Sequence, residues 1–251
     1  MTTPKTCSRR NFLGTTVVAT IAASFLGLSV ILSALVAGAQ RAQPEPTGWH
    51  NLFAANLSDA ICPPDVWSWQ DGVLSPKDKD EAIWSRQEYE NFLLDLEFKL
   101  EPGANSGVFV YCTNIVNWIT NHVEIQILDD AAPKWTNVPP TWKCAGIFGH
   151  ASPMNAMVKS PGEWNHLAIR CVGPRISVWL NGALVTDINM KDWKSGTKNP
   201  DGTDIPAFEP RPLANMPTKG RIGLQGAHGG IPTHFRNLRI KLLNPHAEKE
   251  Q

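Results

Sequence analysis

The chain has 251 residues, with 23 basic and 23 acidic side chains, so its formal net charge at pH 7 is zero. A chain without a basic excess offers no positive field to a phosphate backbone, which argues against nucleic acid as a partner. After a linker at 40–48, the remaining length fits one domain at 49–244 and a short C-terminal tail at 245–251.

Residues 1–39 have the features of a twin-arginine export signal. Arg9 and Arg10 precede Phe-Leu, an uncharged apolar run covers 13–37, and Ala37-Gly38-Ala39 offers a small-residue cleavage site. We therefore expect a periplasmic or extracellular protein. A run of about 25 apolar residues could also span a bilayer, so a retained anchor stays open as the alternative. Contact with a membrane would come only through this segment.

Downstream of the linker, the chain predicts about eleven short strands and almost no helix. Bounded apolar or alternating runs lie at 67–74, 92–100, 107–112, 164–172, 175–180, 183–188, 220–225 and 233–242. Asp71-Gly72 and Asn181-Gly182 interrupt these runs, and the second pair is a strong signal for a two-residue hairpin turn. This pattern predicts an all-β fold, most simply a jelly-roll sandwich of two antiparallel sheets.

A further strand at 122–128 carries polar residues on one of its faces. Side chains alternate along a strand, so Val123, Ile125 and Ile127 would point into the core, while Glu124 and Gln126 would share the opposite face. Asp129 would face away from Glu124 unless a one-residue bulge turned it back. The interpretation is a catalytic surface around Glu124, and a solvated edge strand is the alternative.

The 190–219 segment is rich in proline and has no strand periodicity. A long irregular loop in a compact domain is usually functional or disordered. We expect a lid on the substrate side, contacting substrate through Trp193 and Arg211, with exposed linker residues as the other interpretation.

No cofactor is expected from the cysteine and histidine spacing. Loss of the signal would remove Cys7 and leave four cysteines, which pair or stay reduced with equal expectation. A metal would most simply be a structural calcium near Asp129 and Asp130, with His122 and His150 as neighbours, although no calcium-loop spacing is visible.

Eight motifs resemble the 3-keto-disaccharide hydrolase domain family. In order they lie at 48–53 (Gly-Trp-His-Asn-Leu-Phe), 105–108, 124–129, 146–149, 161–165, 179–182, 220–225 and 235–238. The resemblance implies a concanavalin A-like jelly roll, related in shape to glycoside hydrolase family 16. Glu124, Gln126 and Asp129 look like a degenerate form of the E-x-D-x-x-E strand motif of that family. Tyr111, where the family has arginine, and the loop around His228 depart from the pattern.

The same resemblance implies cleavage of glycosidic bonds in 3-keto sugars by elimination and later hydration. Glu124 would remove the C2 proton, with Asp129 and His228 as further catalytic groups. Gln126, Asn105, Tyr111, Gln225, Arg236 and Trp142 would bind the carbohydrate substrate. A non-catalytic carbohydrate-binding module and an ordinary family 16-like glycosidase are the alternatives.

Overall fold

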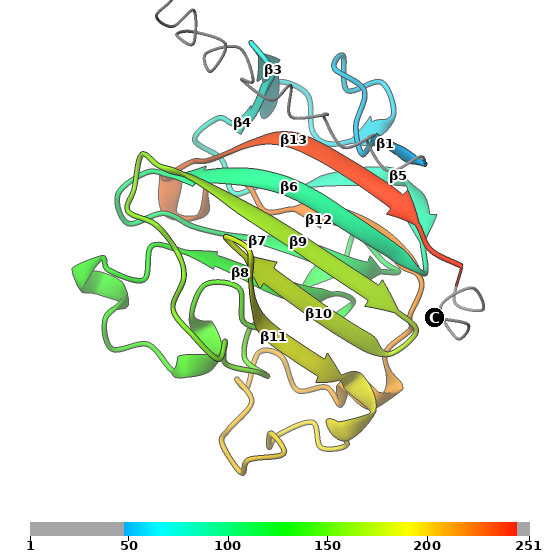
Figure 1. The fold of residues 1–251 in the computed structure, drawn as a ribbon, viewed down its shortest axis with the longest axis vertical. Coiled ribbons are helices and arrows are strands. Elements are labelled where there is room, and N and C mark those ends of the chain that lie inside the picture. The colour runs from blue at the N-terminus through cyan, green and yellow to red at the C-terminus, as the bar shows by residue number, and fades with distance from the viewer. Residues whose placement is uncertain (1–47, 245–251) are drawn as a thin grey trace, which may run out of the picture. The chain divides into compact units, whose positions relative to one another are not determined.

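The computed structural model describes residues 48–244, which form a two-layer β-sandwich (Figure 1). The expected signal at 1–39, nearly all of the linker and the C-terminal tail lie outside the described residues. The strands are β1 (Trp49–Asn51), β2 (Ala60–Ile61), β3 (Trp67–Gln70), β4 (Val73–Pro76), β5 (Ile83–Tyr89), β6 (Phe92–Leu100), β7 (Asn105–Cys112), β8 (Val123–Leu128), β9 (Trp164–Val172), β10 (Arg175–Leu180), β11 (Ala183–Asn189), β12 (Gly220–Leu224) and β13 (Thr233–Leu242).

All strand pairs are antiparallel and belong to two sheets. The larger sheet has the order β11-β10-β9-β6-β13-β4-β3, with β1 paired to β13, and the smaller has the order β2-β5-β12-β7-β8. Figure 1 looks onto the larger sheet, with the smaller sheet behind it. The predicted all-β sandwich of two antiparallel sheets is confirmed.

The core lies between the two sheets because alternate side chains of each strand point inward. Along β6, the five side chains at alternate positions from Phe92 to Leu100 are fully buried, while the intervening Asp95, Glu97 and Lys99 lie on the outer face. From the smaller sheet, Val123, Ile125 and Ile127 of β8 join this core. The predicted inward face of β8 is therefore correct.

The two predicted hairpin turns have the expected backbone. Asp71 and Gly72 join β3 to β4 with φ values of 51° and 78°, and Asn181 and Gly182 join β10 to β11 with φ values of 51° and 86°. Two successive left-handed residues are the requirement of a type I′ turn, whose twist suits antiparallel strands. The first turn places Gln70 of β3 opposite Val73 of β4, and the second places Leu180 of β10 opposite Ala183 of β11.

The described cysteines, Cys62, Cys112, Cys144 and Cys171, are all free thiols. Burial raises the pKa of Cys171 to about 12, so this thiol packs as a small apolar group. The reduced alternative therefore holds in this structure.

The short 3₁₀ turns complete the connections: η1 (Trp118–Thr120), η2 (Pro133–Trp135), η3 (Pro140–Trp142), η4 (Met190–Asp192), η5 (Leu213–Asn215) and η6 (His228–Gly230). In residues 48–244 there is no helix with the length and apolar character that crossing a membrane requires.

Candidate active site around Glu124

Glu124 and Gln126 lie on the outer face of the smaller sheet and open into a cavity of about 360 Å³. This volume falls in the range of small-molecule sites. We call this cavity the Glu124 pocket. It is lined by Asn105, Trp118, Ile119, Glu124, Gln126, Trp135, Trp142, Phe148, Phe208, Glu209, Gln225 and His228.

Space for the Glu124 side chain comes from a glycine on the neighbouring strand. In the β7–β8 register, Gly107 pairs with Gln126 and Phe109 pairs with Glu124. A Cβ atom at Gly107 would lie 2.1 Å from Glu124 Oε1 and 2.8 Å from its Cδ. Only a glycine leaves Glu124 in this position, which explains the glycine at 107 in β7.

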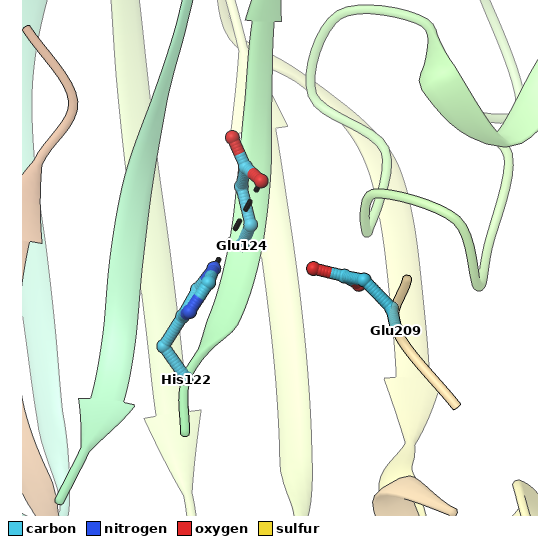
Figure 2. Close-up of side chains that lie close together, drawn as sticks. All are labelled: His122, Glu124 and Glu209. Carbon is cyan, nitrogen blue, oxygen red and sulfur yellow. Dashed lines mark ion pairs between the residues drawn. The ribbon is translucent and has the colours of Figure 1, made fainter. Parts of the chain in front are cut away.

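Three ionisable side chains lie close together beside the pocket (Figure 2), and two of them, Glu124 and Glu209, line it. Glu124 lies on β8, His122 directly precedes that strand, and Glu209 reaches them from the separate 190–219 segment. Nε2 of His122 lies 3.9 Å from Oε2 of Glu124, and one ligand atom from each of the three residues lies within 4.8 Å of the others. We refer to these three residues as the acid cluster.

Burial perturbs the titration of the acid cluster. Desolvation raises the pKa of Glu124 to about 8 and that of Glu209 to about 7, although the Arg211 cation opposes both shifts. Desolvation also lowers the pKa of His122 to about 4. Near neutral pH, the cluster therefore holds a neutral imidazole and two carboxyls whose pKa values lie close to the ambient pH.

The His122 ring is held in one orientation. Its Nδ1–H donates to the carbonyl of Trp118 at 2.5 Å, and the ring packs against Phe109 with centroids 4.3 Å apart. This bond leaves Nε2 with a free lone pair, and that buried atom has no hydrogen-bond partner among the described residues. The lone pair is directed toward the carboxyls.

Arg211 anchors the 190–219 segment beside the pocket. Its guanidinium donates to the carbonyls of Ile119 and His122, both at 2.7 Å, and lies 3.4 Å from Glu209 Oε2. Trp193, the other expected lid contact, donates through its indole to the carbonyl of His150 and to Asn199 Oδ1. The segment does wall the pocket, but Arg211 and Trp193 anchor it and do not line the cavity.

The segment contributes Phe208 and Glu209 to the pocket, and the sequence analysis did not single out either residue. Glu209 is one of several acidic residues in a proline-rich stretch and lies 85 positions beyond Glu124 in the chain. No motif with a fixed spacing therefore connects the two residues. Its 3% exposure is the informative signal, because carboxyls are rarely buried without a role or a partner.

Side-chain amides line one wall of the pocket. Asn105 Oδ1 accepts a hydrogen bond from Gln126 Nε2 at 3.2 Å, and Gln126 Oε1 is buried without a partner in the described part of the chain. Gln225 also faces the pocket, its backbone held by Ser106 Oγ at 3.0 Å. The three predicted amide contacts therefore converge, and they can hydrogen-bond to hydroxyl groups.

Aromatic rings also line the pocket. Trp118, Trp135 and the predicted Trp142 line the cavity, and the Trp142 ring lies 4.9 Å from that of Phe148 and 6.2 Å from that of Phe208. Flat apolar faces of this kind support the carbon-bound hydrogens of a ring-shaped ligand.

His228, predicted as a further catalytic group, lines the same pocket as Glu124. Its Nδ1 lies 2.6 Å from Asp80 Oδ2, and this hydrogen bond raises the pKa of the imidazole. A half-exposed imidazole whose protonated form is stabilised by a carboxylate can act as a proton donor.

Asp129 is a correction to the predicted site. The β7–β8 register runs without a shift from Asn105–Leu128 to Val110–Val123, so no bulge turns Asp129 toward Glu124. Its Oδ2 instead accepts the backbone N–H of Gly103 at 2.7 Å. Asp129 shapes the turn before β7 and does not supply a second carboxyl.

Tyr111 is a second correction. Its side chain is fully buried in the core, where the hydroxyl donates to the carbonyl of Gly173 at 2.9 Å and the ring meets Phe92 edge to face. The inward face of β7 holds this residue away from any ligand, so Tyr111 does not contact substrate in the Glu124 pocket.

Arg236 is a third correction. It lies on β13 in the larger sheet, where Nε and Nη2 bond both oxygens of Glu97 at 2.9 and 3.1 Å, and its guanidinium stacks 4.1 Å from the Trp164 ring. This arrangement belongs to the outer face of the other sheet, so Arg236 has a structural role.

The predicted set of metal-binding residues is also only partly correct. Asp130 accepts the backbone N–H of Cys144, and His150 donates to the carbonyl of Phe148. Of the four expected residues, only His122 joins a set that could ligate an ion, together with Glu124 and Glu209. One nitrogen and two carboxylate oxygens suit a divalent cation, and the hydrogen bond at Nδ1 orients the imidazole as metal sites require.

Comparison with known proteins agrees with this picture. The model of the 3-keto-alpha-glucoside-1,2-lyase-like domain family matches residues 44–241. No curated protein matches the chain in a sequence search. The crystal structure of a candidate glycosyl hydrolase from Parabacteroides distasonis ATCC 8503 is 55% identical, has a TM-score of 0.76, and the alignment covers 78% of this chain and 99% of that one. A second such structure from the same strain, at 21% identity, has a TM-score of 0.64 over 78% and 94% of the two chains and supports the fold alone.

Proposed function

Because the chain belongs to the 3-keto-alpha-glucoside-1,2-lyase-like domain family, we propose that it cleaves the glycosidic bond of 3-keto-α-glucosides by elimination. The 55% identical structure described as a candidate glycosyl hydrolase supports a carbohydrate-active protein. The observation that carries the proposal is Glu124, a buried carboxyl whose pKa burial raises to about 8, at the floor of a pocket lined by amides and aromatic rings.

The carbonyl at C3 makes elimination chemically accessible. It acidifies the hydrogen on C2, because negative charge formed there spreads onto the carbonyl oxygen. A base removes that proton, the electron pair forms a C1–C2 double bond, and the bond from C1 to the leaving oxygen breaks. The leaving oxygen takes a proton, and later addition of water across the double bond gives the net result of hydrolysis.

The pocket supplies a group for each step. Glu124 in its carboxylate form is the base, and a pKa near the working pH is the optimum for this role. His228, paired with Asp80, is the proton donor for the leaving oxygen. Gln126, Asn105 and Gln225 bind sugar hydroxyls, and Trp142 stacks on the ring.

The unpartnered His122 Nε2 favours a second assignment for the acid cluster. A divalent cation held by His122, Glu124 and Glu209 would polarise the C3 carbonyl, and Glu124 would then serve as a ligand. The two assignments differ in whether a chelator abolishes turnover.

The decisive experiment measures product release from a 3-keto-α-glucoside and from its unoxidised parent. We expect cleavage of the keto sugar alone, with the unsaturated keto sugar as first product and loss of turnover in Glu124→Gln. Binding of both sugars without turnover would contradict the proposal and indicate a carbohydrate-binding module. Cleavage of the unoxidised parent would indicate an ordinary glycosidase.

We further propose that residues 1–39 direct export through the twin-arginine route, so that the domain works in the periplasm or outside the cell. The Arg-Arg-Asn-Phe-Leu sequence and the Ala-Gly-Ala site support this proposal. Substituting both arginines by lysine should retain the precursor in the cytoplasm.

A further inference from the structure

A second cavity, of about 560 Å³, adjoins the Glu124 pocket. Trp142 and Phe208 line both spaces, so these two rings form the partition between them. The other principal walls of the second cavity are Pro139, Pro206, Ala207 and Pro210. A molecule bound beside Glu124 could therefore extend past the partition without leaving the protein surface.

The walls of the second cavity are held in place by close backbone packing. A Cβ atom at Gly149 would lie 2.8 Å from Pro206 Cδ, and one at Gly196 would lie 3.2 Å from the carbonyl oxygen of Pro210. Asn199 Nδ2 adds a hydrogen bond to the carbonyl of Gly149 at 3.1 Å. Proline restricts φ, so the segment loses little further freedom when a ligand binds. The cavity is preformed.

The lining of the second cavity is chiefly apolar. Its polar side chains are Thr197 and Asp204, and the Asp204 carboxylate already pairs with Lys198 Nζ at 2.6 Å. Phe208 is 53% exposed although it is a large apolar side chain. A second sugar would bring several hydroxyl groups and find few partners, whereas a flat apolar ring would cover Phe208 and Trp142.

We propose that the second cavity binds the leaving group of the substrate and selects a planar aryl aglycone over a second sugar. This inference rests on the proposed function, because it assigns the space next to the bond that is cleaved. In this arrangement, Phe208 and Trp142 contact both halves of the substrate. The polar sugar of an aryl glycoside would occupy the Glu124 pocket, and its apolar ring would occupy the second cavity.

The test compares three 3-keto-α-glucosides whose leaving groups are methanol, 4-nitrophenol and glucose. We expect kcat/KM of the wild type to be highest for the nitrophenyl substrate. Because 4-nitrophenol is also the better leaving group, each variant is compared with the wild type on the same substrate, so that this chemical difference cancels. Ala207→Trp fills the second cavity only, since the exposed Ala207 does not line the Glu124 pocket. This variant should raise KM for the nitrophenyl substrate about tenfold and leave the methyl substrate within about twofold.

Ala55→Trp is the matched control, because Ala55 is exposed and lines neither cavity. Equal kinetics of Ala207→Trp and Ala55→Trp with the nitrophenyl substrate would overturn the inference. An equal loss with the methyl and nitrophenyl substrates would also overturn it, and thermal unfolding would show whether the variant is folded.

A binding measurement separates this inference from the proposed function. Unoxidised 4-nitrophenyl α-glucoside should quench tryptophan fluorescence of the wild type, and Ala207→Trp should weaken that binding about tenfold. If none of the keto substrates is cleaved but this difference holds, the proposed function fails and the cavity assignment stands. If all keto substrates are cleaved and the two proteins bind the nitrophenyl glucoside equally, the proposed function stands and the cavity assignment fails.

Discussion

Gly107 lies diagonally across from Glu124 on the adjacent strand, so close that a single methyl group at Gly107 would lie 2.1 Å from Glu124 Oε1. The carboxyl occupies the space that any other residue at Gly107 would fill. The position of the candidate base is therefore set by the absence of a side chain on the neighbouring strand.

Gly107→Ala should displace the Glu124 carboxyl and reduce kcat/KM about a hundredfold, because small misplacements of a reacting group are costly. Gly72→Ala is a useful contrast, because this variant should affect folding slightly and leave turnover unchanged. Gly72 has φ of 78° with nothing within 4 Å of an added Cβ, so that variant should lose about 1 kcal/mol of stability and keep its activity. Full activity in Gly107→Ala would remove the steric argument.

The pH dependence of turnover follows from the pKa of Glu124. In His228→Ala, which lacks the candidate proton donor, kcat/KM should rise with pH and level off above about 8, where the Glu124 carboxyl is ionised. In the wild type, loss of the His228 proton with rising pH should oppose this increase. A pH profile of His228→Ala that is flat between 6 and 8 would exclude Glu124 as the titrating base.

The same shift predicts how stability depends on pH. The folded pKa of Glu124 lies above its ordinary value of 4.5, so the folded state binds more protons than the unfolded chain between pH 4.5 and about 8. The free energy of unfolding should therefore fall as pH rises through that range. Glu124→Gln should weaken this slope, and denaturant titrations at pH 5 and pH 8 would measure it. An unchanged slope would mean that Glu124 is ionised at neutral pH in the folded protein.

Calcium and manganese ions should raise the melting temperature if the acid cluster holds a cation. At a concentration 100 times Kd, such binding adds about 2.7 kcal/mol of stability. His122→Ala should abolish the effect, whereas Asp129→Asn should retain it because Asp129 bonds Gly103 outside the cluster. Loss of turnover after chelation, with recovery when the ion is added back, would indicate that Glu124 is a metal ligand. Full activity after chelation would indicate that Glu124 acts as the base without a metal.

Arg236→Ala should keep kcat/KM within about twofold of wild type. Its partner Glu97 lies with it on the outer face of the larger sheet, and a partly exposed ion pair contributes at most about 1 kcal/mol. A large loss of activity without a loss of stability would return Arg236 to the site.

The strand pattern predicted most of the fold. Alternation over 92–100 and 164–172 matches the bounds of β6 and β9, and the Asn181-Gly182 turn joins the strands expected on either side. Such features depend on residues close together in the sequence. The irregular 190–219 segment was predicted as a substrate-side lid, but the residues chosen for it, Trp193 and Arg211, do not line the pocket. Its conformation depends on contacts such as those of Arg211 with the carbonyls of Ile119 and His122, which no local pattern reveals.

By itself, the sequence determined the all-β class, the inward and outward faces of β8, and the placement of Glu124 and Gln126 on one face. These follow from the two-residue period of a strand, which is a local property. Only the tertiary structure decided that Glu209 would be the second carboxyl and that Asp129, Tyr111 and Arg236 would serve the framework. Those outcomes depend on which distant segments pack together, and a strand's own periodicity carries no information about the side chains that reach its outer face from elsewhere in the chain.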